Sequence, residues 1–124
     1  MKLRIQGNSL RLRVSQKEVA QLRHSHHVEA LIEFGPGNEL AYSLTGSVWA
    51  TSATAIFDGR AIRVTVPARV MTEWTETGRV GIEATSQSGV QLLIEKDYQC
   101  LHGSDEPDAD AYPHPLMAGP GQAA

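Results

Sequence analysis

The sequence predicts an α+β fold dominated by strands, in which two pseudo-repeated ββαββ units form one eight-stranded, barrel-like domain with two short helices. Apolar and polar residues alternate with a period of two over most of the chain, which is typical of strands with one buried face. Residues that tolerate positive φ separate the alternating runs. The two halves also match at a constant offset, since Gly7 meets Gly59 and Leu12 meets Val64, each 52 residues further on.

The first unit opens with a predicted hairpin that joins residues 2–6 to residues 9–14 through a Gly-Asn turn. Ser15 and Glu18 then have the spacing of a capping box. In this motif the serine oxygen accepts a hydrogen bond from the amide of Glu18, and the carboxylate accepts one from the amide of Ser15. The pattern predicts a short helix directly after the hairpin.

A second hairpin is predicted from residues 28–34 and 39–44, joined by a Gly-Pro-Gly-Asn segment. One face of its first strand is expected to be buried, and this face carries Val28, Ala30, Ile32 and Phe34. The order of elements in the first unit is therefore ββαββ.

The offset carries this unit onto the second one without a gap, so the pseudo-repeats cover residues 1–45 and 53–97 of a single domain, residues 1–101. The alternative is that two α+β stretches only share a rhythm. One unit of about 45 residues buries too little surface to fold alone. We therefore expect the eight strands to close into a barrel or a pair of packed sheets, with the helices over the ends and the sheet edges removed.

Charge is distributed unevenly along the 124 residues, whose net charge is −3. Residues 1–27 hold six basic and one acidic side chain, whereas residues 98–124 hold four acidic and no basic ones. Attraction to polyanions must therefore come from the first quarter of the chain. The tail, which we define as residues 102–124, is rich in Gly and Pro, and we expect it to be acidic and flexible.

The expected location is the cytoplasm. No stretch approaches the length of apolar sequence that a membrane helix needs, and the alternating first residues do not resemble a secretion signal. The single cysteine, Cys100, permits no disulfide within the chain.

Two segments resemble the AbrB/MazE-like swapped-hairpin domains. Residues 7–14, Gly-Asn-Ser followed by an alternating strand, are similar to the start of that motif, and residues 64–70 are similar to its later part, with Pro67 at the first helical position. The first copy departs from the motif at Ser15, where the family has proline, and the second at Thr65, where the family has arginine.

In that family two ββαββ chains interleave into one barrel, and many members bind DNA through the first strands and their turn. The resemblance implies that one chain supplies both halves here. The whole chain also resembles a group of small uncharacterised bacterial proteins that share the Gly-Asn-Ser opening, the segment of residues 94–101 and an acidic tail. That group implies no activity.

A basic patch on the first hairpin is the leading candidate site. Four cations share the polar side of two adjacent strands, and we expect them to contact DNA phosphates: Lys2, Arg4, Arg11 and Arg13. The alternative is a solvated face, in which Glu29 and Glu33 pair with these cations across strands.

Three histidines, His24, His26 and His27, form a weak candidate for metal binding, and a polar loop between helix and strand is the favoured interpretation. No cofactor is expected. Trp49, in the linker between the units, is expected either to plug a barrel end or to mark a contact surface. Cys100 lies beside His102, and a structural cysteine is favoured over a reactive thiol.

No catalytic motif was found, so we expect a non-enzymatic protein. DNA binding through the basic patch is the sharper hypothesis. A protein-interaction module or scaffold, with the acidic tail engaging a basic partner, is the alternative.

Overall fold

The computed structural model describes residues 1–98, so the tail, Cys100 and His102 lie outside the described residues. The strands are β1 (Lys2–Gln6), β2 (Ser9–Val14), β3 (His27–Gly35), β4 (Asn38–Ser47), β5 (Thr54–Phe57), β6 (Ala61–Pro67), β7 (Gly81–Thr85) and β8 (Gln91–Lys96). The helices are α1 (Gln16–Ser25) and α2 (Ala68–Glu76). The predicted α+β class, with eight strands and two short helices, is confirmed.

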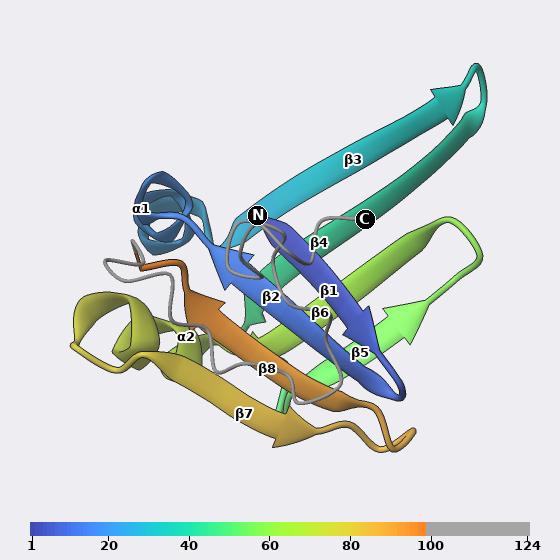
Figure 1. The fold of residues 1–124 in the computed structure, drawn as a ribbon. Helices are drawn as coiled ribbons and strands as arrows, with labels where there is room; N and C mark the ends of the chain where they lie inside the picture. Colours follow the sequence, from blue (N-terminus) through green and yellow to red (C-terminus); the bar gives the residue numbers. More distant parts are fainter. Residues whose placement is uncertain (99–124) are drawn as a thin grey trace, which may run out of the picture.

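The strands form two four-stranded sheets that exchange hairpins between the halves (Figure 1). Sheet A has the order β1-β2-β8-β7, and sheet B has the order β3-β4-β6-β5. The pairs within each hairpin are antiparallel, whereas β2 with β8 and β4 with β6 are parallel. Each sheet therefore combines one hairpin from each half of the chain.

The pairing inside the hairpins follows the offset of 52 residues. Lys2 lies opposite Arg13 in β1–β2, and Thr54 lies opposite Thr65 in β5–β6. Likewise, the pair Glu29 and Ser43 in β3–β4 corresponds to the pair Gly81 and Glu95 in β7–β8. The two halves thus share both the order of their elements and the registers of their hairpins.

The parallel pairs between hairpins differ by two residues. Leu10 lies opposite Leu92 in sheet A, but Ile62, the counterpart of Leu10, lies opposite Tyr42 and not Leu40 in sheet B. A shift of two keeps every side chain on its own face of the sheet. It also moves the tip of β3–β4 outward by roughly 7 Å, since a strand rises about 3.3 Å per residue.

The core lies between the inner faces of the sheets and beneath the helices. Leu12 and Val64, which occupy equivalent positions, are each 1% exposed. The other fully buried large side chains come from both sheets and both helices: Val14, Leu22, Val28, Leu44, Val66, Met71, Trp74, Thr75 and Ile94. The alternating pattern therefore identified the buried face of the central strands correctly.

Local signals set the helix boundaries. The capping box of α1 is present, since Ser15 Oγ accepts from the amide of Glu18 at 3.2 Å and the Glu18 carboxylate accepts from the amide of Ser15 at 3.0 Å. Pro67 lies at the N-cap of α2, one residue before the expected position, because it still belongs to strand β6.

Two expectations about the ends of the domain were wrong. The helices pack against each other at one end, where Arg23 donates to the carbonyl of Thr75 at 2.8 Å, and they do not cover both ends (Figure 1). The sheet edges were also expected to be removed. Instead, the described strands form a packed pair of sheets with four edge strands, β1, β7, β3 and β5. Hairpin exchange places each inner strand in a parallel pair, which leaves these outer strands at the edges.

Candidate functional site

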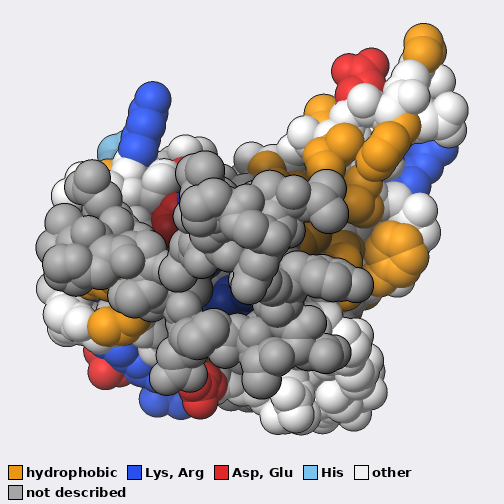
Figure 2. Space-filling model, in the orientation of Figure 1, with side chains coloured by type: hydrophobic (Ala, Val, Ile, Leu, Met, Phe, Trp, Pro, Cys, Tyr) orange, Lys and Arg blue, Asp and Glu red, His pale blue; other side chains and the backbone are white. Residues whose placement is uncertain are grey.

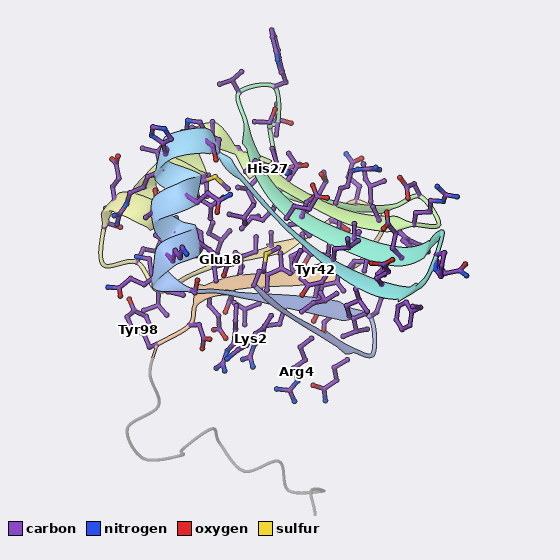
Figure 3. The ribbon with its side chains drawn as sticks, turned by 90° about the horizontal axis from the view of Figure 1, so that it is seen from above. Lys2, Arg4, Glu18, His27, Tyr42 and Tyr98 are labelled. Carbon is purple, nitrogen blue, oxygen red and sulfur yellow. The ribbon has the colours of Figure 1, made fainter. Side chains whose placement is uncertain are left out.

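The four predicted cations form one block on the outer face of sheet A. Lys2 lies opposite Arg13 and Arg4 lies opposite Arg11, so the side chains occupy adjacent positions on two neighbouring strands. Figure 3 shows Lys2 and Arg4 on the outer side of β1, on the opposite side of the molecule from His27. We call Lys2, Arg4, Arg11 and Arg13 the basic block.

Acidic side chains from the second half of the chain pair with three members of this block. Lys2 Nζ lies 2.8 Å from Asp97 Oδ2, whereas Arg11 Nε and Arg13 Nε lie 3.1 and 3.0 Å from Glu95 Oε1. The hydrogen bond from Lys2 holds the pKa of the Asp97 carboxyl below its usual value.

The acids that we expected to pair with the block, Glu29 and Glu33, lie in the other sheet. That expectation was wrong because β2 takes β8, and not β3, as its second neighbour. Glu95 therefore enters the row of Lys2 and Arg13.

Arg4 and Arg11 border a shallow hollow of about 620 Å³ on this face, which Glu83 and Leu93 also line. Within residues 1–98, Arg4 has no ion pair. The basic block is thus largely neutralised, and Arg4 is the member that is most available to an outside anion.

The three histidines have separate local roles. His27 bonds Thr45 through Nδ1 at 2.8 Å and lies 3.3 Å from Glu29 through Nε2, whereas His26 caps α1 in the left-handed region, with φ 59°. Among the described residues, no three His, Cys, Asp or Glu side chains are grouped as metal ligands. The structure therefore does not bring His24, His26 and His27 together around one ion.

Trp49 does not plug the end of the domain. It lies in the β4–β5 connection and is 91% exposed, beside Val48, which is also exposed. The expectation that Trp49 plugs a barrel end was therefore wrong, and its role in a contact surface stays a prediction.

Sequence reasoning missed an apolar cleft at the end of the domain opposite the helices. The cleft has a volume of about 410 Å³ and opens between the inner faces of the two sheets. Its lining is mostly apolar and includes Ile5, Leu10, Leu40, Ala55, Phe57, Ile62 and Val90. Ile5 and Phe57 are 61% and 65% exposed, although their positions in the pattern predict burial.

The β3–β4 hairpin, whose Leu40 lines the cleft, projects from the domain and exposes apolar side chains (Figures 1 and 2). Ile32 and Phe34, on its expected buried face, are 47% and 72% exposed, because sheet A does not extend over them. Leu31 and Ile56 are exposed on the other face of sheet B. Strands that are apolar on both faces are usually covered on both faces.

A turn beside the cleft is held by ionic contacts. The carboxylate of Asp58 accepts from the amides of Arg60 and Ala61 at 2.9 and 2.8 Å and also pairs with Arg63. These contacts lower the pKa of Asp58 to about 2. These contacts fix the conformation of the β5–β6 turn, which follows the cleft residue Phe57.

Comparison with known proteins gives a family but no function. No helix among the described residues is long and apolar enough to cross a membrane. A search of curated proteins and a search of solved structures each gave no match. The family described as "Family of unknown function (DUF7009)" matches residues 1–116, which is most of the chain, and the chain therefore belongs to this family.

Proposed function

We propose that this protein is a non-enzymatic protein-interaction module that acts through the apolar cleft and the tip of β3–β4. The observation that carries the proposal is the concentration of exposed apolar side chains at this end, among them Ile5, Phe34 and Phe57. Soluble monomers rarely expose large contiguous apolar patches, and such patches mark interaction sites. A cytoplasmic location fits this role.

The cleft favours a partner that supplies apolar side chains in an extended segment. Its lining has no charged residue, so binding gains free energy mainly by removing apolar surface from water. Two edge strands, β1 and β5, contribute to the lining, and edge strands offer backbone hydrogen bonds to an added strand.

Selection from a library of random peptides displayed on phage tests this proposal with the full chain as bait. We expect enrichment of extended peptides with apolar residues at alternating positions. Ile5→Asp and Phe57→Asp should abolish their binding, whereas Trp49→Asp, at an even more exposed apolar residue elsewhere, should retain it. Failure to enrich any peptide, or equal binding by all three variants, contradicts the proposal.

AbrB-like DNA binding through the basic block is a second candidate, supported by the adjacency of its four cations and by Arg4, which has no ion pair with another described residue. The hairpin exchange between halves is similar to the interleaving expected from the resemblance. Fluorescence anisotropy with random duplex DNA should give binding that weakens steeply with salt and is lost in Arg4→Ala/Arg11→Ala. Absence of binding at low salt rules this function out.

A further inference from the structure

We infer that the partner is a second copy of this chain, each copy inserting the tip of its β3–β4 hairpin into the cleft of the other. This inference rests on the proposed function, because it names the occupant of the same surface. A two-fold axis relates the two copies, so one type of contact occurs twice and the assembly closes as a dimer.

The first argument is that the hairpin has no cover within its own chain. β3 and β4 contain 9 and 10 residues, whereas their counterparts β7 and β8 contain 5 and 6. The register shift of two residues adds to this projection. Ile32 and Phe34 therefore extend past the strands that would otherwise bury them.

The second argument is that the tip of the β3–β4 hairpin and the apolar cleft have matching chemistry and lie at the same end of the molecule. The tip offers Ile32 and Phe34, and the cleft offers Ile5 and Phe57. A two-fold arrangement covers both apolar surfaces of both copies at once. An unrelated peptide in the cleft would leave the tip exposed.

The third argument is charge complementarity. Glu33 and Glu39 lie opposite each other near the tip, and like charges in this position repel. Arg60 lies in the β5–β6 turn, three residues after Phe57, which lines the cleft. Within residues 1–98 none of these three side chains has an ion pair, so a second copy brings the two unpaired carboxylates toward the unpaired guanidinium group of Arg60.

Sedimentation velocity of the full chain over a range of concentrations tests the inference. We expect a monomer–dimer equilibrium that Phe34→Asp weakens by roughly tenfold or more, since a charge would then enter an apolar contact. Trp49→Asp should leave the equilibrium unchanged. Circular dichroism of each variant checks that the fold is retained, which the exposure of both residues favours.

A charge-reversal pair makes the test independent of folding. Glu33→Arg/Glu39→Arg carries positive charge on both tip and rim, and Arg60→Glu carries negative charge on both, so each variant alone should dimerise more weakly than the wild type. Mixed together, they should form a heterodimer, because each tip then meets a rim of opposite charge. If these charged side chains acted only within their own chain, mixing the two variants would not restore dimerisation.

The outcomes separate the two proposals. A chain that stays monomeric at all concentrations, or whose dimer is unaffected by Phe34→Asp, overturns the second-copy inference. If such a monomer still selects apolar peptides, the interaction module stands and its partner is a different protein. If it selects none, both proposals fail.

Discussion

The hairpins β3–β4 and β7–β8 occupy equivalent places in the two halves and have the same internal register, yet their surfaces have opposite character. Glu95, which neutralises two arginines of the basic block, corresponds to Ser43. Glu83 corresponds to the exposed Leu31, and the buried Ser86 follows β7 at the position that corresponds to the exposed Phe34. Pairing geometry and surface chemistry are therefore specified by different residues of the same strand.

The two ends of β4 should differ most in their contribution to stability. Leu44, which is fully buried near the helices, should cost about 2–5 kcal/mol of unfolding free energy when changed to Ala, because the substitution leaves a cavity. Leu40, which only partly packs against the core near the open end, should cost less in the same assay. Urea denaturation of both variants measures this difference, and equal losses would show that the open end is packed as tightly as the helix end.

The neutralising role of β8 can be removed by Glu95→Gln. Arg11 and Arg13 then lose a shared anionic partner, so affinity for duplex DNA at low salt should rise several-fold. Glu83→Gln, on the neighbouring strand and without an ion pair within residues 1–98, is the matched control and should have a smaller effect. Fluorescence anisotropy compares the two variants, and an equal gain would mean that only net charge matters.

The smallest expected effect concerns the turns of the other two hairpins. Asp58 is ionised in the folded state down to about pH 2, below the usual carboxyl pKa near 3.8, so its contacts stabilise the fold above about pH 4. This contribution is lost as the pH falls through the folded pKa. Asp58→Asn should therefore lower the melting temperature at pH 7 and leave it near the wild-type value at pH 2. Gln6, the counterpart of Asp58, should give no such pH-dependent difference when changed to Ala.

Much of the fold could be predicted because its signals are local. Alternation located the four strands of the first half, and the offset of 52 residues carried them onto the second half. The spacing of Ser15 and Glu18 located the start of α1. The partner of β2 could not be derived from local pattern, since a parallel pair between distant strands leaves no mark on either strand. Glu95 and Asp97 were therefore missed as partners of the basic block.

The cleft was missed for a different reason. A strand pattern shows which face is apolar, but not whether the opposite sheet is long enough to cover that face. The sequence did contain one signal for the exposed β3–β4 hairpin beside the cleft. Ala30, Leu31 and Ile32 interrupt the alternation, and such an apolar run indicates a strand with both faces covered.

Hairpin exchange has a consequence for how the chain can be divided. The connection between the halves is exposed at Trp49, but cutting it would not release two domains, because each sheet contains strands from both pieces. The nicked protein would remain one particle, held together by two parallel strand pairs. Neither piece could keep a four-stranded sheet alone, so the separated fragments would regain their structure only by recombining with each other.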